Sequence, residues 1–162
     1  TLPKHQPEVF KRARAHKGAS FVEVFQNCIV YNDGAYDHFT AKDVAADRQI
    51  LVEHKKPLIF GADRDQGIRM RPGRIELEVV TISENGVTEA DILVHDETNK
   101  SLATLLAHME SPAFPVAIGV LYCDPAETYE AAVHAQVDAE KKAHPKPDLN
   151  ELLRSGPTWT IE

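Results

Sequence analysis

The sequence contains little cysteine and no long apolar run, and each shortage excludes a class of protein. Its 162 residues include two cysteines, Cys28 and Cys123, which lie far apart in the chain. No signal-peptide pattern opens the sequence, and two cysteines without such a pattern favour free thiols in a reducing compartment. No stretch of about 18 apolar residues is present, so we expect no membrane span. We therefore expect a cytoplasmic protein whose two cysteines are not joined in a disulfide.

Basic residues are also in short supply. The chain has 25 Asp and Glu residues against 18 Lys and Arg, which gives a formal net charge of −7. A nucleic-acid-binding surface requires a basic stripe, so we expect no nucleic-acid partner. A hydrophobic share of 43% is typical of a globular chain. Because the first residue is Thr1, we expect a processed chain or a piece of a longer one.

The N-terminal segment has the pattern of a helix followed by a strand. Apolar residues at helical spacing predict a helix over residues 7–17, with Gly18 as its stop. Residues 19–25 then predict a buried strand, and a polar loop with Cys28 leads to a turn at residues 32–34. A loop after a strand is where an open α/β sheet places its chemistry.

The next segment is ambiguous. Thr40 is a possible cap for a short helix over residues 41–49, and residues 50–52 either extend that helix or begin a strand. This ambiguous segment is the best candidate for a boundary between two domains, so we predict domains at residues 1–38 and 39–162.

From Pro57 onward the pattern predicts an antiparallel excursion rather than further parallel winding. A turn is expected at residues 84–86, and residues 90–94 are either a strand or the entry to the next element. In the strand expected at residues 74–82, Ile75, Leu77 and Val79 point to one side. The other expected strands are residues 58–61 and 67–70.

The last part of the chain is mostly helical. A helix over residues 99–109 presents Leu102, Leu105, Leu106 and Met109 on one face, with Thr98 or Asn99 as its cap. A strand is expected at residues 116–121, a long helix with Tyr129, Val133 and Val137 on its apolar stripe at 126–143, and a short helix at 149–154. Trp159 lies in the tail.

Cys28 is open to three interpretations on the residues alone. A buried free cysteine that packs as a small apolar side chain is common. A nucleophile would need a nearby His and an orienting carboxylate, and no such signature surrounds Cys28. A cluster ligand normally accompanies other cysteines at short spacing, and here only Cys123 is available.

The triplet His95-Asp96-Glu97 is the densest group of polar residues with chemical potential. It offers a base with a carboxylate, or two metal ligands. The alternative, which we favour, is a solvated strand end with acidic residues ahead of the next helix. His108 and His134 are expected to be solvated.

Arg69, Arg71 and Arg74 form a small basic cluster in an acidic protein. Such a cluster suits a phosphate of coenzyme A. Surface pairing with Glu76 and Glu78 is the interpretation that we favour.

One segment resembles a known enzyme family. Residues 16–24, HKGASFVEV, followed by Asn27-Cys28, are similar to the late part of the β subunit of 2-oxoacid:ferredoxin oxidoreductases, with the 2-oxoglutarate type nearest. The resemblance continues more loosely through most of the chain, at residues 67–69, 93–97, 114–120 and 128–130.

The resemblance implies a fold, a reaction and a set of cofactors. The fold is α/β, with the C-terminal end of a doubly wound thiamine-diphosphate-binding domain followed by a small α+β extension. The reaction is the oxidative decarboxylation of a 2-oxoacid, with coenzyme A taking the acyl group and ferredoxin the electrons. The whole enzyme uses thiamine diphosphate with Mg²⁺ and a [4Fe–4S] cluster, and it needs an α subunit. Cys28 matches the fourth cluster ligand, and Asn27 is assigned to cofactor binding.

The chain also departs from the family pattern. It has no Cys-x-x-Cys and no Gly-Asp-Gly segment, which in the family hold the cluster and the Mg²⁺–diphosphate. We therefore expect the chain alone to bind no cofactor and to be inactive. We also expect its extension to shield the cluster site, with the Leu102–Met109 face and Trp159 as apolar cover. The alternatives are a non-catalytic module that binds a partner or small ligand, and, more weakly, a cysteine hydrolase.

Overall fold

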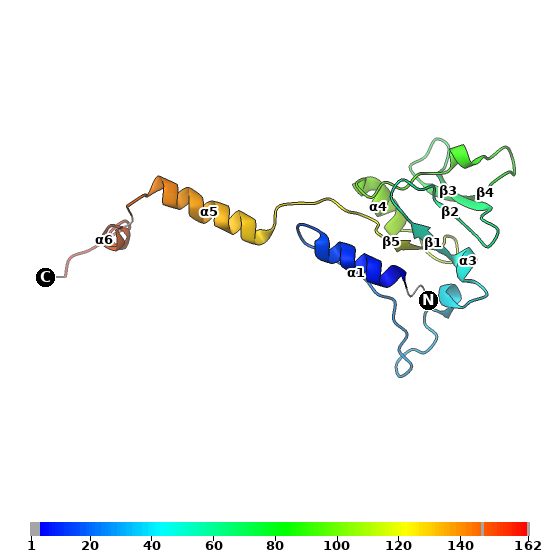
Figure 1. Cartoon of the computed structure of the whole chain (residues 1–162), viewed down its shortest axis with the longest axis horizontal. Coiled ribbons are helices and arrows are strands. Elements are labelled where there is room, and N and C mark those ends of the chain that lie inside the picture. The colour runs from blue at the N-terminus through cyan, green and yellow to red at the C-terminus, as the bar shows by residue number, and fades with distance from the viewer. Residues whose placement is uncertain (1–3, 147, 162) are drawn as a thin grey trace. The chain divides into compact units, whose positions relative to one another are not determined.

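The computed structural model describes residues 4–146 and 148–161. The chain divides into two compact units, Thr1–His16 with Ser20–Pro125, and Lys17–Ala19 with Ala126–Glu162. The first unit contains all the strands (Figure 1). The predicted boundary between residues 38 and 39 concerns the parts of a longer enzyme and stays a prediction.

A parallel strand pair and an antiparallel sheet make up the first unit, which confirms the predicted α/β class. β1 (Gln49–Val52) pairs in parallel with β5 (Val116–Gly119). β2 (Ile59–Phe60), β3 (Gln66–Met70) and β4 (Leu77–Thr81) form an antiparallel sheet in that order. The expected antiparallel excursion is therefore confirmed, whereas the β1–β5 pairing was not predicted.

The core of the first unit lies between these strands and α4 (Lys100–Ala107). Ile50 and Ile68 are fully buried, and Leu106 is 2% exposed. Asn99 caps α4 by accepting the N–H of Leu102 at 3.0 Å, which satisfies a free donor of the first turn. The helix predicted at residues 99–109 is confirmed, with two of its apolar side chains, Leu102 and Leu106, buried in this core.

The helix predicted at residues 41–49 is wrong. Two single turns replace it, α2 (Asp37–Thr40) and α3 (Ala45–Arg48), and the chain then enters β1. Thr40 does not cap a helix, because its hydroxyl donates to the carbonyl of Tyr36 at 2.8 Å. Residues 50–52 form a strand because Ile50 and Val52 alternate into the core, at 0% and 3% exposed.

The buried strand predicted at residues 19–25 is also wrong. The segment has no regular hydrogen-bonding partner, and Phe21 is 91% exposed. A strand needs a neighbour to pair its backbone groups, and none of the described residues supplies one here. The helix before it is confirmed as α1 (His5–Ala15), and Gly18 adopts a φ of 112° beyond its end.

Near β4, the predicted placement of one side chain is wrong and a predicted turn is confirmed. Ile75 is 84% exposed, because β4 begins only at Leu77 and Ile75 lies in the preceding turn. The turn at residues 84–86 is confirmed, with positive φ at Asn85 and Gly86. Residues 90–94 are the entry to the next element, since a 3₁₀ turn, η1 (Glu89–Asp91), replaces a strand.

The second unit contains α5 (Tyr129–Ala143) and α6 (Leu149–Leu153). Thr128 caps α5 by accepting the N–H of Ala131 at 3.2 Å. Both predicted helices are confirmed with shifted ends. Neither buries a side chain, and Tyr129 of the expected apolar stripe is 81% exposed. Among the described residues, no helix combines the length and the apolar character that a bilayer span requires.

A core substitution tests this arrangement. We expect Leu106→Ala to lower the free energy of unfolding by about 2–5 kcal/mol, because it removes buried methyl groups and leaves a cavity. Urea unfolding followed by circular dichroism measures the loss. The matched control is Leu152→Ala, whose side chain is 68% exposed and whose effect should stay within about 0.5 kcal/mol. Equal effects of both variants would contradict the described core.

Candidate functional site

Cys28 lies in an exposed loop between α1 and α2. The backbone N–H of Asn32 donates to the carbonyl of Cys28 at 3.0 Å, which closes a tight turn over the intervening residues. Neither cysteine is in a disulfide, as predicted; Cys28 is exposed and Cys123 is half-buried. The interpretation of Cys28 as a buried apolar side chain is therefore wrong.

The ends of this loop are joined by the side chain of Asn27. Its Nδ2 donates to Asp33 Oδ1 at 2.8 Å, and its Oδ1 accepts the N–H of Gly34 at 3.0 Å. Gly34 has a φ of +72°, a conformation that glycine adopts without steric cost. The predicted turn at residues 32–34 is confirmed.

The loop backbone acts on the Cys28 thiol. Hydrogen bonds from the backbone of Tyr31 and, second, of Val30 lower the pKa of Cys28 below its usual value. These bonds stabilise the thiolate, which is the form that ligates metals and attacks electrophiles. The loop therefore presents an exposed sulfur whose thiolate form is stabilised relative to that of an ordinary cysteine.

The described residues do not complete a metal site around this sulfur. No three His, Cys, Asp or Glu side chains converge anywhere in residues 4–146 and 148–161. A [4Fe–4S] cluster is held by four ligands, usually cysteines, and the described residues bring no three such ligands together. The assignments of Cys28 as a cluster ligand and of Asn27 to cofactor binding stay predictions.

The triplet at residues 95–97 is not a solvated strand end, which corrects the favoured interpretation. His95 is 0% exposed, and its Nε2 lies 2.8 Å from the carbonyl oxygen of Val120. Its backbone pairs with Lys55 and Lys56, and these bonds hold it inside the fold. Asp96 alone behaves as expected: hydrogen bonds from Thr98 lower its pKa.

Glu97 joins α1 to the rest of the first unit. Arg12 Nη2 donates to Glu97 Oε1 at 2.7 Å, and this bond raises the pKa of Arg12. A second polar contact lies beside it, between His16 Nδ1 and Cys123 Sγ at 3.6 Å. Arg12 and Glu97 are 85 residues apart in the sequence. No local pattern relates them, so this pair was not predictable from the sequence. A cysteine nucleophile needs a nearby histidine. In this structure it is Cys123 that has one beside it, His16.

Other polar side chains behave as predicted. Arg69 Nε donates to Glu78 Oε1 at 2.7 Å, which lowers the pKa of Glu78. Arg71 and Arg74 lie within salt-bridge distance of Glu76, so the pairing interpretation is confirmed. His108 and His134 are exposed.

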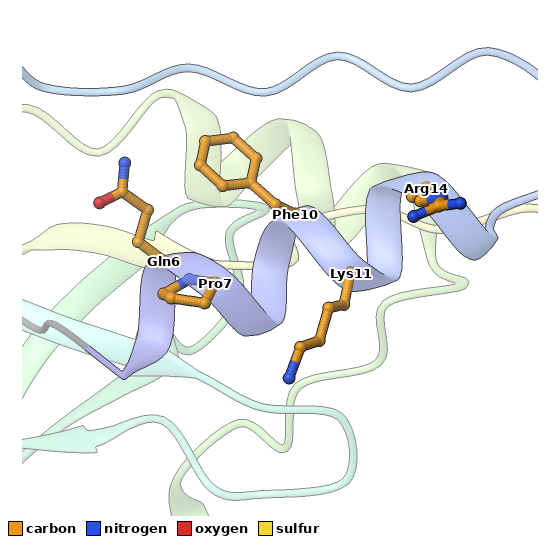
Figure 2. A pocket seen from close by; sticks show the side chains of 5 residues that line it. All are labelled: Gln6, Pro7, Phe10, Lys11 and Arg14. Carbon is orange, nitrogen blue, oxygen red and sulfur yellow. The ribbon is translucent and has the colours of Figure 1, made fainter.

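A shallow hollow on α1 offers no further chemistry. Figure 2 shows its lining, which comes from that one helix. The residues are Gln6, Pro7, Phe10, Lys11 and Arg14. Its two charged side chains, Lys11 and Arg14, are both cations, and the set contains no carboxylate, histidine or thiol.

The predicted apolar cover for the Cys28 loop is not available as described. Leu102 is 8% exposed and Leu106 is 2% exposed, because both pack in the core of the first unit. Trp159 lies in the second unit and is 84% exposed. Leu102 and Leu106 are therefore not available as cover, whereas the shielding of the cluster site in the intact enzyme stays a prediction.

Comparison with known proteins supports the resemblance. The chain is 31% identical, over 170 aligned residues that include 96% of its length, to 2-oxoglutarate oxidoreductase subunit KorB of Mycobacterium tuberculosis. It spans 42% of that relative, less than half of its length. No family model matches the chain. No solved structure matches it either. The similarity confirms the resemblance to the C-terminal portion of a β subunit of this enzyme family.

The bond between Arg12 and Glu97 should control the attachment of α1. Because α1 has no buried residue, we expect Arg12→Ala to speed hydrogen exchange of the α1 amides about 5–30-fold, equivalent to about 1–2 kcal/mol. Exchange in α4 serves as the internal reference. The control is Lys11→Ala, which breaks an exposed pair with Glu8 and should have a much smaller effect. Unchanged α1 exchange in Arg12→Ala would contradict this role.

The two thiols should differ in reactivity. We expect Cys28 to be alkylated by iodoacetamide faster than Cys123 at pH 7, because Cys28 is exposed and its lowered pKa keeps the thiolate populated at lower pH. Peptide mass spectrometry over a pH series measures both sites in one sample. Faster labelling of Cys123, or a Cys28 midpoint at or above that of an ordinary thiol, would refute the prediction.

Proposed function

We propose that this chain is part of the β subunit of a 2-oxoacid:ferredoxin oxidoreductase, with 2-oxoglutarate as the 2-oxoacid. The observation that carries the proposal is the 31% identity to subunit KorB over 96% of the chain. In the proposed reaction a 2-oxoacid loses CO₂, coenzyme A takes the acyl group as a thioester, and the electrons released pass to ferredoxin. The proposed partners are an α subunit, ferredoxin, coenzyme A and the 2-oxoacid.

The role of this chain within that enzyme is structural and ligand-presenting. Cys28 is proposed as one thiolate ligand of a [4Fe–4S] cluster, a role supported by its exposure and its lowered pKa. Thiamine diphosphate and Mg²⁺ are proposed cofactors of the whole enzyme. The described residues make no complete site for any of these groups, so the chain alone is proposed to be inactive. The proposal includes a cytoplasmic location, which two unpaired cysteines support.

A second candidate is a non-catalytic module that binds a partner. It is favoured by one observation, that no three metal-ligating side chains converge among the described residues. The two candidates differ in whether the assembly that contains this chain turns over a 2-oxoacid.

Purification of the assembly decides between them. We expect the tagged protein, isolated without oxygen from its own cells, to reduce a viologen dye only when both 2-oxoglutarate and coenzyme A are present. The chain expressed alone, supplied with thiamine diphosphate and Mg²⁺, should release no CO₂. An assembly that is inactive with every 2-oxoacid tested would favour the non-catalytic module. Release of CO₂ by the chain alone would contradict the proposal that this chain is inactive without the rest of the enzyme.

A further inference from the structure

A small cavity lies in the first unit, where the end of α3 meets the first residue of β3. Its volume is about 320 Å³, which falls in the range of about 300–1,000 Å³ typical of small-molecule pockets. Three polar side chains and one apolar side chain line it: Asp47, Arg48, Gln66 and Val44. One anion, one cation and one amide in a single wall are suited to a small polar ligand.

The polar side chains of this cavity are held in place by other parts of the first unit. Arg48 Nη1 donates to the carbonyl of Pro112 at 2.8 Å. Asp47 Oδ1 accepts the backbone N–H of Ala62 at 2.9 Å. Gln66 begins β3, whose backbone pairs with a strand on either side. A ligand therefore meets groups that are already positioned, so its binding orders fewer side chains.

Arg48 is the member of this set that indicates an anionic group on the ligand. It is half-buried, and no acidic side chain of the described residues lies within salt-bridge distance of it. The other half-buried arginine that the structure describes, Arg69, is paired with Glu78 at 2.7 Å. Because only Nη1 of Arg48 is engaged, the edge formed by Nε and Nη2 keeps the two parallel N–H groups that bind a carboxylate. A carboxylate on the ligand would supply the missing partner.

Asp47 sets a second requirement, because its carboxylate lies in the same wall. Its Oδ1 accepts from Ala62, while its Oδ2 has no hydrogen-bond donor among the described residues. A dianion would be repelled by this carboxylate and by the net charge of −7 on the chain. A zwitterion satisfies both charged side chains without adding net charge, since its carboxylate pairs with Arg48 and its ammonium group with Asp47.

We propose that this cavity binds a small neutral α-amino acid, with its carboxylate on Arg48 and its ammonium group on Asp47. The two residues are consecutive in the chain and line one cavity, so the ligand must carry its two charges close together, as α-amino acids do. The amide of Gln66 offers a further donor and acceptor, and Val44 an apolar contact. The inference is independent of the proposed enzyme, because it uses no residue assigned to that function.

The test is a titration of the purified 162-residue chain with L-alanine, followed by the NMR shifts of its backbone amides. We expect saturable shifts at residues 44–48 and 61–66, and no shift in the loop that carries Cys28. Propionate lacks the ammonium group of alanine, and ethylamine lacks its carboxylate. Each should bind at least about tenfold more weakly than alanine, because each loses a hydrogen bond between charged groups.

Two substitutions make the test specific to the charged pair. Arg48→Gln removes the cation and should weaken alanine binding by at least about tenfold. Asp47→Asn keeps an oxygen acceptor for Ala62 but removes the negative charge, so alanine should bind more weakly and propionate more tightly than to the unmodified chain. The controls are Arg64→Gln and Asp63→Asn, which remove the same charges from exposed side chains outside the cavity lining. Both should bind alanine as the unmodified chain does.

Three results would overturn the inference. The first is an alanine titration whose shifts do not saturate or lie outside residues 44–48 and 61–66. The second is propionate binding to the unmodified chain as tightly as alanine. The third is alanine binding by Arg48→Gln or Asp47→Asn that equals binding by the controls. The amide spectrum of each variant also shows whether it is folded, and a failure here is separate from a failure of the dye-reduction assay, which tests the proposed enzyme.

Discussion

The parallel pairing of β1 with β5 is the constraint on which the rest of the first unit depends. Gln49 lies opposite Val116 and Val52 opposite Gly119, so the two strands join segments more than sixty residues apart. Gly119 is required there, because a Cβ would collide with the carbonyl of Val52. The intervening chain forms the antiparallel sheet and α4, and it packs against Ile50 and Val52. The same pairing brings Val120 to His95 and Cys123 to the backbone of Glu97.

Local patterns predicted the elements of this fold better than the contacts between them. The helix predicted at residues 99–109 carried a cap and an apolar face, and α4 has the Asn99 cap and buries Leu102 and Leu106 of that face. The strand at residues 19–25 had the same quality of local signal, yet the described residues contain no neighbour for it. Apolar composition reports that a segment is suited to burial, whereas burial itself requires a surface to pack on. Among the described residues Phe21 has no such surface, and its side chain is 91% exposed.

The residues of the candidate site likewise fall into those that the sequence predicted and those that it did not. A family resemblance singled out Asn27 and Cys28, and the structure places both in one closed loop with a stabilised thiolate. The buried His95 and the bond between Arg12 and Glu97 were not predictable, because they join residues from separate elements. In polar triplets such as residues 95–97, the sequence alone does not distinguish a solvated end from a buried one. Here the backbone bonds of His95 to residues 55 and 56 decide the outcome.

We propose that the Cys28 loop presents one thiolate to a cluster whose other ligands lie outside the described residues. It is tested most directly by the iron and sulfide content of the anaerobically purified assembly, with Cys28→Ser compared against Cys123→Ser. Serine removes one thiolate in each case, but only Cys28 is proposed to bind the cluster. We expect Cys28→Ser to lose the characteristic absorbance and most of the iron, while Cys123→Ser keeps both. Full cluster content in Cys28→Ser would contradict it.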